Sequence, residues 1–264
     1  MLQKGDKKLI HSWAFYDWAN SVYSLVISTA VFPIYYETVT QSESGMVNFL
    51  GIQFNNTSLY TYALSFSFLI VAFISPILSG IADYVGNKKS YMQFFCYLGS
   101  ISVISLFFFE GVDTLWIGIL FSILASVGFW GSLVFYNAYL PEVAYNDQQD
   151  QVSALGFIYG YIGSVILLIF NLTMVMKPEW YGITEPGMAP RLSFLTVGVW
   201  WMGFAQITFR RLPKDNREGL SLEMIKNGNS EILKVFREML QNLGFYEEIG
   251  KNLVLADEQG RSVR

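Results

Sequence analysis

Residues 13–36 read WAFYDWANSVYSLVISTAVFPIYY, a run of about 24 residues in which Asp17 is the only charged side chain. An α-helix needs roughly 20 predominantly apolar residues to cross the hydrocarbon core of a bilayer. The run has that length, and it is predominantly apolar without the strict alternation of polar and apolar residues that the strands of a membrane β-barrel show. It therefore predicts a membrane-spanning helix.

Five further stretches have the same character, and charged and turn residues gather in the breaks between them. They are Leu59–Ser79, Tyr91–Phe109, Thr114–Leu140, Val152–Met176 and Arg191–Phe209. The sequence thus predicts an all-α integral membrane protein whose core is a bundle of six transmembrane helices.

Charge divides the chain into two parts. Residues 1–209 carry 19 of the 38 Asp, Glu, Lys and Arg side chains, and the last 55 residues carry the other 19. We expect residues 1–209 to form the bundle and residues 210–264 to form a polar cytoplasmic linker or tail. Within the tail, Ser230 is a candidate N-cap for one amphipathic helix that includes Ile232, Phe236 and Leu240.

Several function classes are excluded by composition. Cys96 is the only cysteine and His11 the only histidine, so a cysteine zinc cluster and a Ser-His-Asp triad are ruled out. No phosphate-binding G-x-x-x-x-G-K-[ST] loop is present. The net charge is −4, and no basic face is large enough for a nucleic acid. We expect no enzyme, no cofactor, no metal site and no nucleic-acid partner.

The distribution of Lys and Arg predicts the orientation in the membrane. Cytoplasmic flanks carry an excess of these residues, and six spans put both termini on one side. The side that holds the termini has nine Lys and Arg residues near the membrane, and the other side has only Lys177 and Arg191. The nine are Lys4, Lys7, Lys8, Lys88, Lys89, Arg210, Arg211, Lys214 and Arg217. We expect a multi-pass protein of the cell membrane, or of the vacuolar membrane in a eukaryote, with both termini cytoplasmic.

Five short patches, in order and spacing, resemble the vacuole-effluxer-like branch of the major facilitator superfamily. They are Trp13–Tyr23, Phe32–Tyr36, Phe135–Glu142, Ser153–Gly156 with Gly160–Gly163, and Trp200–Trp201. The resemblance covers about residues 11–213. It implies the N-terminal half of a fold that is built from two six-helix halves.

The resemblance also implies a function. It indicates a secondary active transporter, or its N-terminal half, that moves a small polar solute such as an amino acid by alternating access, with or without proton coupling. The partners would then be the lipid bilayer, the solute and a second transporter half, or a second copy of the chain as a homodimer. The alternative is a non-transporting truncated remnant or membrane anchor whose tail recruits a partner.

A loop after the second predicted helix is similar to the superfamily's G-x-x-x-D-R-x-G-R-R motif. Asp83, Gly86 and Lys88 match it, whereas Ser79, Tyr84 and Asn87 depart from it. The resemblance implies a gate loop in which the Asp83 carboxylate caps the dipole of a neighbouring helix. The alternative is a turn that serves only to orient the chain in the membrane.

A polar stripe follows the first predicted helix. Asp17, Ser21, Ser24 and Ser28 recur at i, i+4, i+7 and i+11, with Asn20 beside them. One interpretation is a water-filled pathway in which Asp17 binds a proton or a substrate ammonium group. The other is that Asp17 lies at the cytoplasmic interface and pairs locally.

Four further groups of residues have two readings each. Asn137 either contacts a solute or hydrogen-bonds a neighbouring helix, and Glu142 either braces an inner gate opposite Lys88 or Lys89 or is solvated. Gly156, Gly160 and Gly163 favour close helix packing over a binding role. Most tryptophans, Trp13 and Trp201 among them, are interpreted as interfacial anchors, and Lys177 and Arg191 as loop charges.

Overall fold

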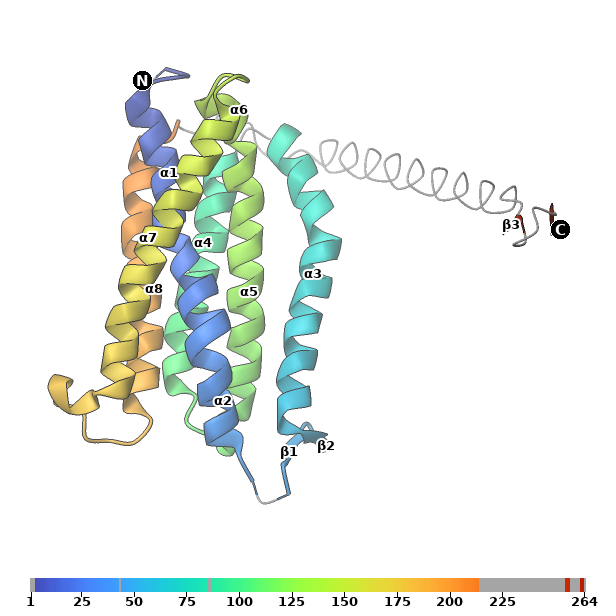
Figure 1. The fold of residues 1–264 in the computed structure, drawn as a ribbon, viewed down its shortest axis with the longest axis vertical. Coiled ribbons are helices and arrows are strands. Elements are labelled where there is room, and N and C mark those ends of the chain that lie inside the picture. The colour runs from blue at the N-terminus through green and yellow to red at the C-terminus, as the bar shows by residue number, and fades with distance from the viewer. Residues whose placement is uncertain (1–2, 43, 85–86, 214–254, 257–261, 264) are drawn as a thin grey trace. The chain divides into compact units, whose positions relative to one another are not determined.

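The computed structural model describes residues 3–42, 44–84, 87–213, 255–256 and 262–263, with the backbone alone at 77, 81–84, 255–256 and 262–263. In this part of the chain six helices are long and apolar enough to cross a membrane. They run over Lys7–Thr40, Asn56–Gly80, Lys88–Phe108, Val112–Val143, Gln149–Met176 and Met188–Arg211. The predicted all-α membrane bundle is confirmed (Figure 1).

The first span changes its helical geometry twice. It consists of α1 (Lys7–Val22), a π-helical segment η1 (Tyr23–Val31) and α2 (Phe32–Thr40). At its start Asp6 is the N-cap, and its carboxylate accepts a hydrogen bond of 2.7 Å from the backbone N–H of Lys8. The π-helical segment ends two residues before Pro33, which has no N–H to donate to the preceding turn.

The other spans are more regular. They are α3 (Asn56–Tyr84), α4 (Lys88–Ser105) extended by the short η2 (Leu106–Phe108), α5 (Leu115–Ala138) preceded by η3 (Val112–Thr114), α7 (Gln149–Met176) and α8 (Met188–Arg211). A single turn, α6 (Leu140–Val143), follows α5, and η4 (Pro178–Tyr181) follows α7.

The predicted outer loop contains an antiparallel hairpin. Strand β1 (Met46–Phe49) pairs with β2 (Ile52–Asn55), with Phe49 opposite Ile52. The turn residues Leu50 and Gly51 have φ of 53° and 81°, the left-handed values that a tight two-residue hairpin turn requires. The hairpin lies at the end of the bundle opposite the N-terminus (Figure 1), and these are called the hairpin end and the N-terminal end.

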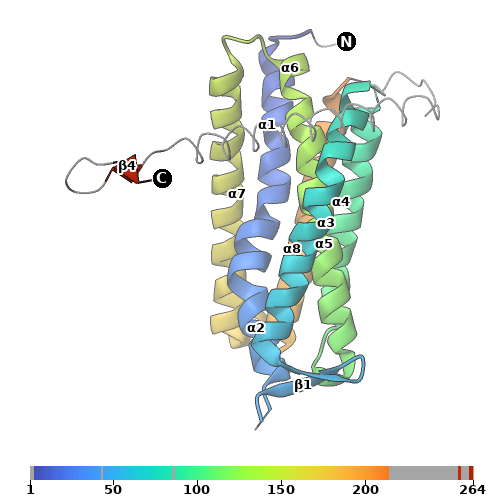
Figure 2. The same cartoon turned by 90° about the vertical axis from the view of Figure 1, so that its right-hand side faces the viewer.

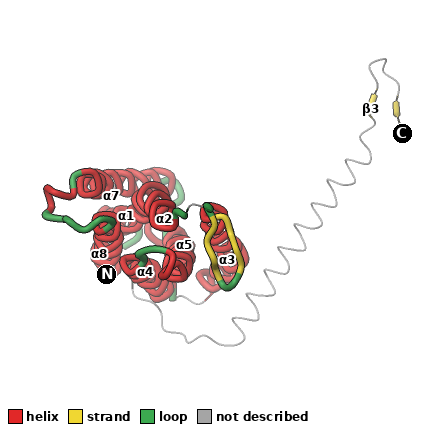
Figure 3. Tube along the Cα trace, turned by 90° about the horizontal axis from the view of Figure 1, so that it is seen from below, coloured by secondary structure: helices red, strands yellow, loops and turns green. Residues whose placement is uncertain are grey.

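Two groups of helices pack around the first span. α1 contacts α7 and α8, while α4 contacts α5 and α8. α3 packs mainly on α5 and lies at the edge of the bundle, as the views in Figures 2 and 3 show. This arrangement leaves one face of the first span between α5 and α7.

α4 and α5 cross at close range through two glycines. A Cβ atom added to Gly128 would overlap the backbone of Gly99, and one added to Gly99 would overlap the buried ring of Trp201 from α8. The three helices therefore meet at a point where only glycine leaves room for the opposing backbone.

The chain divides into two units, Met1–Glu218 and Gly219–Arg264. In the second, β3 (Leu255–Ala256) pairs antiparallel with β4 (Ser262–Val263). The amphipathic helix predicted from Ser230 lies outside the described residues, and its prediction stays open.

Candidate functional site

A cavity of about 650 Å³ lies between the first span, α5 and α7. Its wall combines aromatic side chains with several hydroxyls, one carboxylate and one amide. The polar residues that line it are Asp17, Ser21, Ser24, Thr29, Asn137, Ser153 and Ser164. Four of the six residues that the sequence pattern offered for a pathway (Asp17, Ser21, Ser24 and Asn137) therefore lie around one cavity.

Asp17 lies in α1, well inside the first helix that is long and apolar enough to cross a membrane. It is ten residues beyond the start of α1 and about 10 Å from the middle of the 34-residue span. The hydrocarbon core extends about 15 Å to either side of its midplane. The side chain is 7% exposed, yet it lines the cavity. This depth supports the pathway interpretation over the interfacial one.

The Asp17 carboxylate is held by a tyrosine. The Tyr136 hydroxyl donates a hydrogen bond of 2.9 Å to Oδ2. Tyr136 is itself fixed by Trp13, whose ring stacks on it at 4.1 Å between centroids and whose Nε1 donates to the Tyr136 carbonyl oxygen at 2.9 Å. A carboxylate accepts several hydrogen bonds, and Tyr136 is the hydrogen-bond partner that the described residues supply. Capacity remains for a ligand in the cavity.

Trp13 and Trp201 are not interfacial anchors. Trp13 is 1% exposed and Trp201 is 0% exposed, so both rings belong to the protein core. The interpretation of these two residues as part of a membrane-interface belt is wrong, because the surrounding helices bury both rings and leave no ring surface for contact with lipid headgroups. Trp116 and Trp180, in contrast, are exposed on the surface of the bundle.

Asn20 does not join the cavity. Its side chain is fully buried, and its Oδ1 accepts a hydrogen bond of 3.3 Å from the Ser21 hydroxyl. Its Nδ2 has no partner among the described residues. Asn20 therefore supports Ser21 from behind the cavity wall.

Ser28 is replaced in the cavity wall by Thr29. The α-helical period places Ser28 below Ser24, but the segment between them is π-helical. Such a segment bonds residue i to i+5, so the face moves on by one residue. The Thr29 hydroxyl donates a hydrogen bond of 2.9 Å to the Ser24 carbonyl oxygen, five positions earlier. The sequence pattern was wrong here because it assumed a uniform α-helix.

Asn137 lines the cavity at the N-terminal end of the bundle. It is one residue from the end of α5 and is exposed. Among the described residues its side chain makes no hydrogen bond to a neighbouring helix, so the contacts lend no support to the packing alternative.

The gate-loop candidates are partly brought together. The Lys88 ammonium lies 2.6 Å from Glu142 Oε1 and donates a second hydrogen bond of 3.1 Å to the Ala138 carbonyl oxygen. The pair links the start of α4 to α6, and the side chains are 15% and 44% exposed. Glu142 is thus paired with Lys88. Gly86 and the side chain of Asp83 lie outside the described part of the chain.

The glycines of α7 pack against the polar stripe itself. A Cβ on Gly156 would lie 2.7 Å from both Asp17 Oδ2 and the Tyr136 hydroxyl, and one on Gly160 would lie 2.6 Å from the Ser21 hydroxyl. A Cβ on Gly163 would lie 2.9 Å from the Trp18 carbonyl oxygen. The predicted close helix packing is confirmed, and it occurs directly behind the cavity residues.

We expect Gly156→Ala to destabilise the bundle by about 1–3 kcal/mol, because the added methyl group forces the Asp17–Tyr136 pair apart. Gly203→Ala is the matched control, since a Cβ there meets nothing within 4 Å. The thermal unfolding of both variants, purified in detergent, is the measurement. Equal midpoints of thermal unfolding for the two variants would show that the contact between α1 and α7 accommodates the added methyl group without loss of stability.

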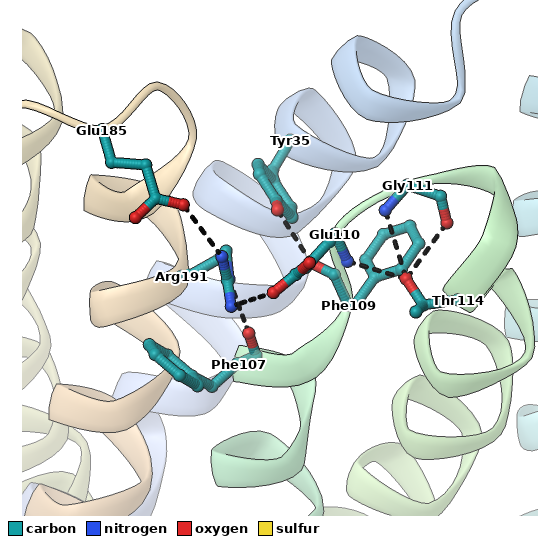
Figure 4. Close-up of polar contacts among 8 residues, drawn as sticks. All are labelled: Tyr35, Phe107, Phe109, Glu110, Gly111, Thr114, Glu185 and Arg191. Carbon is teal, nitrogen blue, oxygen red and sulfur yellow. Dashed lines mark hydrogen bonds and ion pairs between the residues drawn. The ribbon is translucent and has the colours of Figure 1, made fainter.

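Arg191 is a buried residue of α8, not a loop charge. It is 8% exposed, and it anchors a cluster at the hairpin end that Figure 4 shows. Its Nε donates to the Phe107 carbonyl oxygen at 2.6 Å, and a terminal nitrogen lies 2.5 Å from Glu110 Oε1. The guanidinium carbon lies 4.6 Å from the Phe107 ring centroid.

The cluster joins four segments of the chain. Glu185, from the loop before α8, lies 3.8 Å from the other terminal nitrogen of Arg191. The Tyr35 hydroxyl of α2 donates to the Phe109 carbonyl oxygen at 2.8 Å (Figure 4). Lys177, in contrast, is 55% exposed and only 4.0 Å from Glu179, which agrees with its assignment as a loop charge.

Sequence reasoning missed Tyr136, Thr29 and Arg191. Tyr136 precedes Asn137 in the patch Phe135–Glu142, and nothing in its spacing along the chain relates it to Asp17. Arg191 is the first residue of a predicted span, and at that position the neighbouring sequence does not distinguish an interfacial arginine from a buried one. A signal did exist for Arg191: an Arg in a span is a candidate functional residue.

Known proteins resemble this chain in sequence. The family described as "Vacuole effluxer Atg22 like" matches residues 5–245. The "Uncharacterized MFS-type transporter YxiO" of Bacillus subtilis is 37% identical over 201 residues, which cover 76% of this chain and 45% of the relative. "Autophagy-related protein 22-2" of Neosartorya fischeri is 29% identical over a match that covers 78% of this chain and 43% of the relative. "Autophagy-related protein 22-1" of Penicillium rubens is 23% identical over a match that covers 65% of this chain and 39% of the relative.

The chain spans less than half the length of these curated relatives. No solved structure matches it. The family match covers most of the chain and includes the residues that form the cavity, and the resemblance seen in the sequence is confirmed. The chain belongs to the vacuole effluxer Atg22-like family of membrane proteins.

Proposed function

We propose that the six-helix bundle is one half of a secondary active transporter for a small polar solute such as an amino acid. The cavity would form one wall of the solute pathway, with the other wall supplied by a second six-helix half or a second copy of the chain. Two such units that rock about a site between them provide alternating access. The names of the relatives, which include an MFS-type transporter, support this reading.

The observation that carries the proposal is the position of Asp17. An ionisable side chain within a membrane span is costly and is retained mainly for function. Here the carboxylate lies within the span, lines a cavity of about 650 Å³ and has one hydrogen-bond partner among the described residues. It would bind a proton or a cationic group of the solute, which also gives a route to proton coupling.

Lys88 and Glu142 would brace the pathway at the N-terminal end. The pair bridges α4 and α6 close to Asn137 at the end of the cavity. An ion pair that is partly exposed contributes at most about 1 kcal/mol, which suits a contact that breaks and re-forms as the bundles move. We place this end on the cytoplasmic side of the cell membrane.

The orientation is tested with a reporter that is active only outside the cytoplasm. Because cytoplasmic flanks hold the excess of Lys and Arg, the fusion after Arg217 is expected to be silent and the fusion at Gly51 in the hairpin active. An active fusion at Arg217 together with a silent one at Gly51 would contradict the proposed orientation.

Solute flux is the test of the function. Residues 1–264 are reconstituted in liposomes alone and together with the part of the Bacillus subtilis relative that lies beyond its match. We expect saturable flux of at least one member of an amino-acid panel with the pair, and none above empty vesicles with the chain alone. Absence of flux from a correctly inserted pair would favour the membrane-anchor alternative. Flux from the chain alone would indicate a homodimer.

A further inference from the structure

The π-helical segment of the first span changes which side chain faces the cavity. We propose that Thr29 is a second solute-contacting position, set in the pathway by the π-helical geometry of Tyr23–Val31. This inference rests on the proposed transport function and adds a residue that the helical pattern of the sequence excluded.

A uniform α-helix would give the opposite arrangement. With 3.6 residues per turn, the residue four positions after Ser24 returns to the same face, and that residue is Ser28. In the structure Thr29 lines the cavity beside Ser24 and Leu25, and Ser28 does not. The exchange follows from one extra residue in the turn, and π-helical turns of this kind occur often at functional sites.

The segment is fixed on its opposite side. Val26 and Ile27 are 0% and 2% exposed, so they hold the far face of the helix in the core. The Thr29 hydroxyl is bonded to the Ser24 carbonyl oxygen at 2.9 Å. Thr29 is therefore held in the cavity wall by packing behind it and by its own hydrogen bond.

The hydrogen bond also decides what Thr29 offers to a solute. A hydroxyl has one proton, and Thr29 donates it to the Ser24 carbonyl. Toward the cavity its oxygen can only accept. The Ser21 hydroxyl likewise donates to Asn20 Oδ1 and Asp17 is a carboxylate, so these three groups present acceptors, while the Ser24 hydroxyl can donate or accept. This face of the first span suits a solute that carries N–H or O–H donors.

Asp17 and Thr29 define separate positions along the pathway. They are twelve residues apart, which corresponds to at most about 18 Å along the helix axis. A small solute cannot reach both at once. Thr29 would therefore contact the solute at a point nearer the hairpin end, beyond the Asp17 position.

Cysteine labelling tests this register without a transport assay. Thr29→Cys and Ser28→Cys are made in the full chain, and Ser24→Cys serves as the positive control. The native Cys96 is 0% exposed and gives little background. Membranes are treated with a charged, water-soluble thiol reagent. Because the thiolate is the reactive form and needs an aqueous environment, we expect Thr29→Cys to react about tenfold faster than Ser28→Cys or more.

The outcomes separate the inference from the proposed function. Equal rates, or faster labelling of Ser28→Cys, would overturn the π-helical register. In the assembled pair, an amino-acid mixture that supports flux is expected to slow labelling of Thr29→Cys. Flux without such protection overturns the solute contact at Thr29 while the transport function stands. If the panel gives no flux, the proposed function fails, and the solute contact fails with it, whereas the labelling difference still reports the register.

Discussion

Asp17→Asn is expected to weaken solute transport by the assembled pair strongly while leaving the amount of protein in the membrane unchanged. The change removes the only carboxylate in the cavity lining and keeps the side-chain shape. A hydrogen bond to a charged group contributes about 1.5–3 kcal/mol, which corresponds to a loss of about 10- to 150-fold in solute affinity. Flux at a fixed solute concentration and the concentration for half-maximal flux are the measurements.

Stability separates a functional role of Asp17 from a structural one. The native carboxylate is desolvated, and a neutral amide in the same place costs less to bury. The Asp17→Asn variant is therefore expected to unfold at the native temperature or above it. Asp113→Asn, the same change at an exposed position outside the cavity, is the matched control and is expected to transport normally. Unchanged transport by Asp17→Asn would remove Asp17 from the pathway.

Arg191→Gln is expected to lower the free energy of unfolding by about 2–3 kcal/mol. The Phe107 carbonyl oxygen loses its charged donor, and Glu110 loses its partner. This loss of stability is smaller than for a fully buried ion pair, because the Glu110 side chain is 61% exposed and can be hydrated once Arg191 is removed. The midpoint of thermal unfolding in detergent is the measurement.

Lys177→Gln is the control for Arg191. It removes a cation from the same end of the bundle, but its side chain is 55% exposed and lies 4.0 Å from Glu179. Exposed pairs of this kind contribute less than about 1 kcal/mol. A similar loss of stability in the two variants would mean that the Arg191 cluster acts through general charge at this end of the bundle and not through its specific contacts.

The bundle was predictable from the sequence because long apolar runs with short polar breaks admit few other structures in a membrane. The same helical period brought Asp17, Ser21 and Ser24 to one face, where the cavity now includes all three. The period holds only while the helix stays α-helical. It failed at Ser28, since nothing in the local composition marks the turn that holds one extra residue.

Contacts between distant segments were beyond the sequence. Tyr136 and Asp17 are separated by 119 positions, and Arg191 and Glu110 by 81. Spacing along one helix identifies residues on a common face, but it does not say which face of which helix will lie opposite. The tryptophans show the same limit, because the residues around Trp13 and Trp201 in the sequence do not tell whether a ring lies at the membrane interface or in the protein core.

The glycine contact between α4 and α5 has a consequence for how this protein can change over evolutionary time. At Gly99 and Gly128 every other amino acid is larger, and each opposing surface is either backbone or the buried Trp201 ring. At Gly128 the opposing atoms are backbone atoms of Gly99 and Phe95, so no smaller residue can compensate for a side chain there, whereas a side chain at Gly99 requires a smaller residue in place of Trp201. We therefore expect glycine to be retained at position 128, and position 99 to change only together with position 201.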